Sequence, residues 1–203
     1  DQGFPAEHES ITPGGLNALD DNSLMLKVKA GDLDKMALLY ERHNRNLFGF
    51  FYKLTGSGSV SEDLVHNVFY RMLKYRYTFT EDTSGSHRFT AWMYHMARNV
   101  NADHYKKQKK VSYTDDMEPW ERKLKVDENA HSQMAKSQDL ELLQKAIKHL
   151  APEKQEMLIL TKYQGMKYEQ VADIFGITEG AVKVRMHRVL QELREVYLKL
   201  ENV

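Results

Sequence analysis

Apolar residues recur at helical spacing through the first quarter of the chain. They stand at Leu24, Leu26, Val28, Met36, Leu39, Tyr40, Leu47, Phe50, Phe51 and Leu54. Steps of three and four residues place such side chains on one face of a helix, so helices are predicted from about Asp21 to Leu54. The stretch Thr55-Gly-Ser-Gly-Ser59 breaks the pattern and predicts a turn.

The next helix is predicted to begin at Ser61, whose hydroxyl can cap the first turn while Glu62 and Asp63 complement the positive end of the helix dipole. Its apolar residues cover about half of the circumference, which is wider than the roughly 100° stripe that one buried face needs. These residues are Leu64, Val65, Val68, Phe69, Met72 and Leu73. The excess width predicts either contact with a partner or a central place in the chain's own bundle.

A third long helix is predicted from about Phe89 to Lys107, after a loop rich in Thr, Ser, Gly and Asp between Tyr75 and Arg88. One face holds the apolar residues Phe89, Met93, Met96, Ala97 and Val100. Another face carries Trp92, His95, Asn99 and Lys106. Aromatic rings beside cations suit stacking on unpaired nucleotides. The alternative for Trp92 is a packing role.

The chain is predicted to be all-α, with two small helical domains at residues 21–110 and 137–203. Residues 111–136 are polar, contain Glu118-Pro119 and predict a flexible linker. Residues 1–20 hold Pro5, Pro13 and Gly14-Gly15 and predict a flexible leader. The second domain opens with a face of Leu140, Leu143, Ile147 and Leu150. Pro152 suits the first turn of the following helix, whose apolar residues are Met157, Leu158, Leu160 and Tyr163.

The most specific signal runs from Tyr168 to Val182. Small Ala172 allows a close crossing, Gly176 supplies a turn, and Thr178 can cap a second helix that returns Val182 to the core. This spacing is typical of a helix-turn-helix, whose second helix enters the major groove of DNA.

A helical wheel divides that second helix into two sides. The side predicted to be buried carries Val182, Met186, Val189, Leu190, Leu193 and Tyr197. The opposite side carries Val184, His187, Arg188 and Gln191, flanked by Lys183 and Arg185. This pattern favours base contacts in the middle and phosphate contacts on the flanks. The alternative is a bundle helix with an ordinary wet face.

The composition argues against several classes of site and of function. The 203 residues include no cysteine, which excludes disulfides, thiolate metal sites and cysteine nucleophiles. No run approaches about 18 consecutive apolar residues and no signal peptide is evident, so a soluble, cytoplasmic protein is expected. HExxH and GxSxG are both absent and the histidines are scattered. We therefore expect no enzymatic activity, no cofactor and no metal site.

The net charge of zero looks unfavourable for a DNA-binding protein, but the charges are segregated. Residues 1–23 contain acids and no Lys or Arg, whereas residues 98–110 are rich in bases and residues 111–135 are acidic again. Blocks of alternating sign indicate separate working surfaces.

Four segments in order resemble the extracytoplasmic-function (ECF) group of bacterial RNA polymerase sigma factors. They are Leu24-Met25 with Gly31-Asp32, the run from Ser61 to Phe69, the run from Phe89 to Asn99 followed by Asp103, and the run from Gly180 to Arg188. The resemblance covers most of residues 21–200. It implies a sigma region 2 bundle, a region 4 helix-turn-helix, and the partners of such factors: core RNA polymerase through its clamp helices and flap, promoter DNA, and an anti-sigma or other recruiting protein.

The resemblance also implies a role for individual residues. Polymerase binding is expected at Asp63, Leu64, Val65, His66 and Phe69. Binding of the melted minus-ten strand is expected at Ser86, His87, Arg88, Trp92, Met96, Asn99, Asp103, Lys106 and Lys107. Binding of the minus-thirty-five element is expected at Tyr168, Thr178, Gly180, Ala181, Lys183, Val184, Arg185, His187 and Arg188. Lys106, Lys107 and Ala181 depart from the residues that the family usually has at these positions.

Two other classes of function are compatible with parts of this pattern. A stand-alone helix-turn-helix regulator would use the first domain as a sensor or dimerisation module and would bind DNA without polymerase. An enzyme is the more distant alternative, because no compact set of catalytic or metal-binding residues stands out along the chain.

Overall fold

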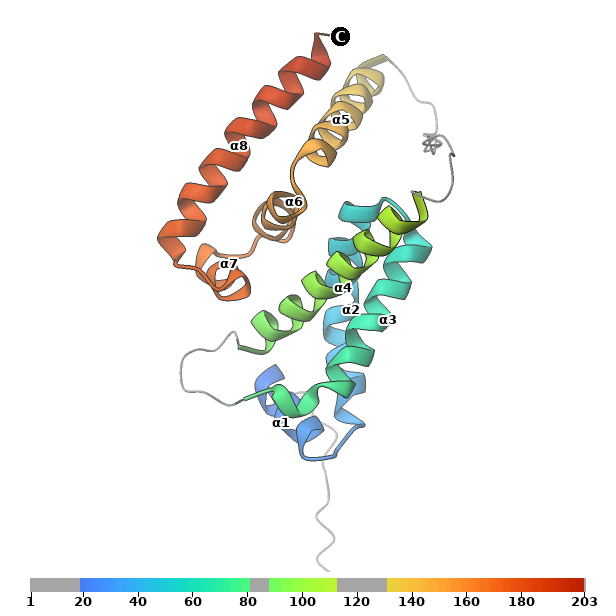
Figure 1. The fold of residues 1–203 in the computed structure, drawn as a ribbon, viewed down its shortest axis with the longest axis vertical. Helices are drawn as coiled ribbons and strands as arrows, with labels where there is room; N and C mark the ends of the chain where they lie inside the picture. The colour runs from blue at the N-terminus through green and yellow to red at the C-terminus, as the bar shows by residue number, and fades with distance from the viewer. Residues whose placement is uncertain (1–18, 81–87, 113–130, 203) are drawn as a thin grey trace, which may run out of the picture.

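The computed structural model describes residues 19–80, 88–112 and 131–202, and every regular element in these ranges is helical. The predicted all-α fold is therefore confirmed (Figure 1). No helix within these ranges has the length and apolarity that crossing a membrane requires.

The first module is a bundle in which α3 packs against both α2 and α4. Its elements are α1 (Asp21–Lys29), α2 (Lys35–Thr55), α3 (Gly58–Lys74), the 3-10 turn η1 (Arg76–Thr78) and α4 (Arg88–Ser112). The two contacts explain the wide apolar arc of α3, because neighbours cover it from two sides. Five of its members are buried and Leu73 is partly buried, so the central place in the bundle is confirmed: Leu64, Val65, Val68, Phe69 and Met72.

The turn before α3 is shorter than predicted. Gly56 ends α2 with a φ of 70°, in the left-handed region that favours glycine. The helix then begins at Gly58 with Ser57 as its cap, so the prediction that Ser61 caps it is wrong. Ser61 is fully buried instead, and its hydroxyl donates to the Ser57 carbonyl (2.6 Å). A local sequence with several serines offers several caps, and packing selects one of them.

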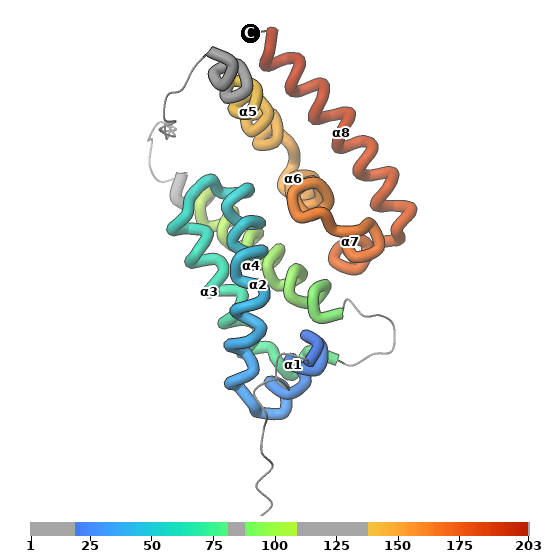
Figure 2. Tube along the Cα trace, turned by 180° about the vertical axis from the view of Figure 1, so that it is seen from behind, coloured from blue at the N-terminus to red at the C-terminus, as the bar shows by residue number. Residues whose placement is uncertain are grey.

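The second module contains α5 (His131–His149), α6 (Pro152–Leu158), the π-helical turn η2 (Ile159–Tyr163), α7 (Tyr168–Phe175) and α8 (Glu179–Glu201). Pro152 lies in the first turn of α6, as predicted. Figure 2 shows α5 and α8 running side by side, while α6 and α7 lie on the side that faces α4.

Three apolar positions predicted to be buried in this module are exposed. The Gln164 N–H donates to the carbonyl of Ile159 five residues back (3.0 Å), and this wider turn moves Tyr163 off the core face, leaving it 43% exposed. Leu190 lies about 80° from Val182 around the helix, at the edge of the buried stripe, and is 40% exposed. Leu140 is 59% exposed where only the last turns of α8 lie beside α5.

Candidate nucleic-acid interface

The helix-turn-helix has the predicted geometry. Ala172 and Val182 are buried, and Gly176 ends α7 with a φ of 64°. The Thr178 hydroxyl accepts from the Ala181 N–H (3.2 Å), which caps α8 as expected. The tight turn holds α7 against α8, so the outer side of α8 is presented as one rigid surface.

The outer side of α8 is polar and exposed. Most of the predicted DNA contacts are exposed: Thr178 at the start of the helix, and Gly180, Lys183, Val184, Arg185, His187 and Arg188 along it. The other two, Tyr168 and Ala181, are half-buried. Two of the cations pair with carboxylates of the same module: Lys183 with Glu179 (3.0 Å) and Arg185 with Glu153 of α6 (3.1 Å). Exposed pairs of this kind contribute little to stability, so both cations can exchange a carboxylate for a phosphate.

A second candidate surface lies along α4. His95 and Asn99 are exposed one turn apart, with the Asn99 amide 3.4 Å from the His95 ring. Trp92 is half-buried, and the ring of Phe79 packs edge-on against it at 5.3 Å between centroids. Phe79 begins the segment up to Arg88 that the family resemblance assigns to the melted strand, and the structure buries Phe79. The half-buried Trp92 therefore packs within the module and is still partly accessible.

The remaining predicted contacts on this surface are spread along α4 rather than gathered at one point. Met96 is only 9% exposed and belongs chiefly to the core. Arg88 is half-buried and donates to Thr80 (3.1 Å), while Lys106 and Lys107 are exposed towards the other end of the helix. Ser86 and His87 lie outside the described residues.

Asp103 is held by the first module itself. The Arg71 guanidinium donates to its carboxylate (2.8 Å), and this hydrogen bond holds the pKa of Asp103 below its usual value. The pair ties α3 to α4. Asp103 therefore stabilises the position of α4, and its carboxylate would repel phosphate if it faced a DNA strand unpaired.

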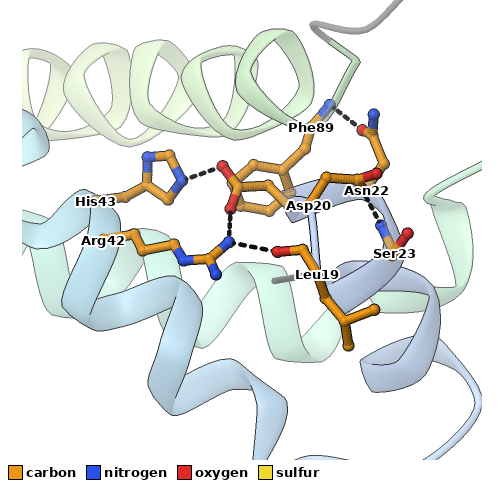
Figure 3. A network of polar contacts seen from close by, with 8 residues as sticks. Leu19, Asp20, Asn22, Ser23, Arg42, His43 and Phe89 are labelled. Carbon is orange, nitrogen blue, oxygen red and sulfur yellow. Dashed lines mark hydrogen bonds and ion pairs between the residues drawn. The ribbon is translucent and has the colours of Figure 1, made fainter. Parts of the chain in front are cut away.

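The start of α4 is fixed by a polar network from α1 and α2 (Figure 3). The side-chain oxygen of Asn22 accepts from the Phe89 N–H (2.9 Å), which satisfies a backbone donor of the first turn from a distant part of the chain. Its neighbour Asp21 accepts from Arg42 (2.8 Å) and His43 (2.7 Å). The His43 hydrogen bond is the largest cause that lowers the pKa of Asp21.

The predicted polymerase-binding residues divide into two groups. Asp63 and His66 are exposed on α3, and the His66 ring lies 3.5 Å from the Tyr40 hydroxyl. Leu64, Val65 and Phe69 belong to the core of the bundle and are at most 6% exposed, and their part in polymerase binding stays a prediction. The wide arc on the helical wheel reflects two neighbours within the module.

The described residues contain no cluster of His, Cys, Asp or Glu that could hold a metal ion.

Comparison with known proteins covers both modules. The family model of sigma-70 region 2 matches residues 39–111, and that of sigma-70 region 4 matches residues 140–193. The ECF RNA polymerase sigma factor BldN of Streptomyces coelicolor is 28% identical over 173 residues, which cover 84% of this chain and 63% of BldN. The RNA polymerase sigma factor CarQ of Myxococcus xanthus is 26% identical over 177 residues, covering 87% of this chain and 97% of CarQ.

Solved structures share the fold. CnrH in complex with the cytosolic domain of CnrY aligns with a TM-score of 0.62 at 19% identity, over 87% of this chain and 96% of the solved chain. The sigma factor RpoE in complex with the anti-sigma factor NepR from Bartonella quintana aligns with a TM-score of 0.57 at 21% identity, over 79% and 94%.

Proposed function

Since this chain belongs to the ECF group of sigma-70 RNA polymerase sigma factors, we propose that α8 reads the minus-thirty-five element, α4 holds the melted minus-ten strand, and α3 docks on core RNA polymerase. The chain is a transcription initiation factor and not an enzyme. The match of residues 39–111 to sigma region 2 excludes the alternative of a stand-alone regulator with a sensor domain.

The observation that carries the proposal is the pair of separate polar surfaces on one chain. The rigid outer side of α8 fits the major groove, where Arg188 can meet base edges while Lys183 and Arg185 approach phosphates. Both flanking cations already pair with carboxylates, so binding replaces these pairs with phosphate contacts.

The α4 surface suits an unpaired strand. An extruded base needs an aromatic partner and a hydrogen-bonding group, and Trp92 and Asn99 supply these two groups about two turns apart on α4. Lys106 and Lys107 extend the surface with positive charge along the same helix.

The contact with the clamp helices is proposed for the exposed residues of α3, chiefly Asp63 and His66. The flap contact is proposed for the second module. We also propose regulation by an anti-sigma or recruiting protein, since CnrH and RpoE were each solved with a bound partner. Action on polymerase would make the protein cytoplasmic.

Co-purification with core RNA polymerase tests the proposal. Asp63→Arg reverses an exposed charge at the proposed contact and should weaken polymerase binding by about 1 kcal/mol or more, because like charges at an interface cost affinity. The matched control is Glu41→Arg, which reverses an exposed charge on α2, outside both proposed polymerase contacts. Wild-type protein that captures no polymerase subunit would refute the function. Unchanged affinity of Asp63→Arg would reject only the docking surface.

A further inference from the structure

The outer side of α8 carries an exposed apolar side chain among polar ones. Val184 is 52% exposed, more than the other exposed apolar residues of this helix, Leu190 at 40% and Leu198 at 44%. Single apolar residues are common on protein surfaces and need no explanation by themselves. Val184 differs because it lies in the second turn of the second helix of the helix-turn-helix, the part that contacts base edges in the major groove.

Val184 lies on the side of α8 opposite the core. Its place two residues after the buried Val182 puts it about 160° from the core face. His187 and Arg188 are exposed on the same side, one turn further along the helix. These two side chains can form hydrogen bonds with a base, whereas the side chain of Val184 cannot. An apolar group of the DNA can cover Val184 without cost, while a polar group would lose its hydrogen bonds to water.

The helical turn before Val184 is built from small residues. Gly180 and Ala181 precede Val184 by four and three residues, which places them on the same side of the helix. Neither the backbone nor packing requires glycine at position 180. Its φ is not positive, and no atom of another described element lies within 4 Å of the place that a Cβ would take. Glycine also occurs where a ligand approaches the backbone closely. The start of α8 can therefore approach the bases closely and bring Val184 to their edges.

The cations beside Val184 are placed for phosphates. Lys183 pairs with Glu179 (3.0 Å) and Arg185 pairs with Glu153 (3.1 Å), on the two flanks of the outer side of α8. Both pairs are exposed, so phosphates can replace the carboxylates. When the flanking cations bind the phosphate backbones, the middle of the outer side, where Val184 lies, faces the base edges.

Thymine is the base that suits an apolar side chain in the major groove. Its C5-methyl group is apolar, whereas guanine, adenine and cytosine present donors and acceptors of hydrogen bonds there. A valine packed against those polar groups would displace water and leave them unpaired, which costs free energy. Packed against a methyl group, the same side chain buries apolar surface on both partners. Val184 therefore favours thymine over the other bases.

We propose that Val184 is a specificity-determining residue that recognises the C5-methyl group of one thymine in the minus-thirty-five element. This inference rests on the proposed function of α8 and adds the base that the helix selects. It also fixes a register. Arg188 lies about 6 Å further along the helix axis, which corresponds to about two steps of the roughly 3.4 Å between base pairs. The thymine should therefore lie within about two base pairs of the position whose preference depends on Arg188.

Uracil tests the proposal, because it pairs as thymine does and lacks only the C5-methyl group. The preferred minus-thirty-five sequence is first selected from random DNA with the holoenzyme that contains the full chain. Each thymine of this element, on either strand, is then replaced singly by uracil, and the affinity of the holoenzyme is measured. We expect one replacement to weaken binding about three- to fourfold, the effect of losing one buried methyl group. Uracil in the spacer between the two promoter elements is the control and should leave the affinity unchanged.

Val184→Ser removes the apolar group from the protein side of the contact. The position is exposed, so the variant should keep its fold, which circular dichroism checks. The variant should bind thymine and uracil alike at the sensitive position. Leu198→Ser is the matched control, because it removes an exposed apolar side chain from the last turn of α8, and it should keep the difference between the two bases.

Equal binding of thymine and uracil by the wild-type holoenzyme at every position would overturn the proposal. A uracil penalty that persists unchanged in Val184→Ser would overturn it as well. If the holoenzyme selects no minus-thirty-five sequence at all, the proposed function of α8 fails and this proposal with it, which is a different result.

Discussion

Asp21→Asn tests the network that positions the start of α4. The Asp21 carboxylate is 27% exposed and accepts from both Arg42 (2.8 Å) and His43 (2.7 Å). A hydrogen bond to a charged group contributes about 1.5–3 kcal/mol, and partial exposure reduces the effect of the two bonds together. We expect the free energy of unfolding to fall by about 1–2 kcal/mol near neutral pH.

The pH dependence gives the sharper test. The His43 hydrogen bond lowers the pKa of Asp21 below its model-compound value of 3.8. A carboxyl with a depressed folded-state pKa stabilises the fold above its unfolded pKa, and this stabilisation is lost as the pH falls through the folded value. The difference in free energy of unfolding between wild type and Asp21→Asn should therefore have its full value at neutral pH. It should shrink only below pH 3.8.

Urea unfolding followed by circular dichroism from pH 7 down to about pH 3 measures both effects. Asp32→Asn is the matched control, because Asp32 pairs with Lys35 on the exposed surface (3.3 Å) and its loss should change stability by less than about 0.5 kcal/mol. A loss of stability in Asp21→Asn that is equal at every pH, or no larger than that of the control, would refute the assigned role of the carboxylate.

Three further predictions concern DNA. Asn99→Ala should lower permanganate reactivity of promoter thymines while polymerase binding is retained, because an extruded base loses a hydrogen-bonding partner; unchanged reactivity would count against the α4 surface. Arg188→Ala should reduce the binding free energy for the preferred minus-thirty-five sequence by about 1–3 kcal/mol and relax the base preference at one position. Lys183→Ala should instead weaken binding to all sequences alike and lower the slope of the salt dependence by about one unit. Glu153→Gln should tighten binding of holoenzyme to promoter DNA at low salt, because Arg185 loses a carboxylate that competes with phosphate; equal affinities in a salt titration would contradict this.

The helix-turn-helix could be predicted in detail because its signals are local. Gly176 adopts a left-handed backbone, Thr178 caps the next helix, and Val182 returns to the core four residues later. Each of these features depends on neighbours within about one turn, and turn and cap chemistry acts over that range. The core face of α4 was predicted correctly for the same reason, from Phe89 to Val100.

The sequence could not say what covers an apolar face. The arc of α3 fitted a partner surface and a central helix equally well, and only the positions of α2 and α4 showed that Leu64, Val65 and Phe69 are internal. Similarly, a periodic pattern could not show that a π-helical turn would rotate Tyr163 out of the core.

The sequence by itself determined the helices, the resemblance of both modules to one family, and the exposed side of α8. Periodicity, caps and turns depend on residues that are close together in the chain. The tertiary structure alone decided the partners of the polar groups. Asn22 reaches Phe89, and Glu156 reaches Arg98 and Asn101, across 55 to 67 residues of chain. A buried carboxylate or amide must find a partner wherever the fold provides one, and no pattern along the chain records which partner that will be.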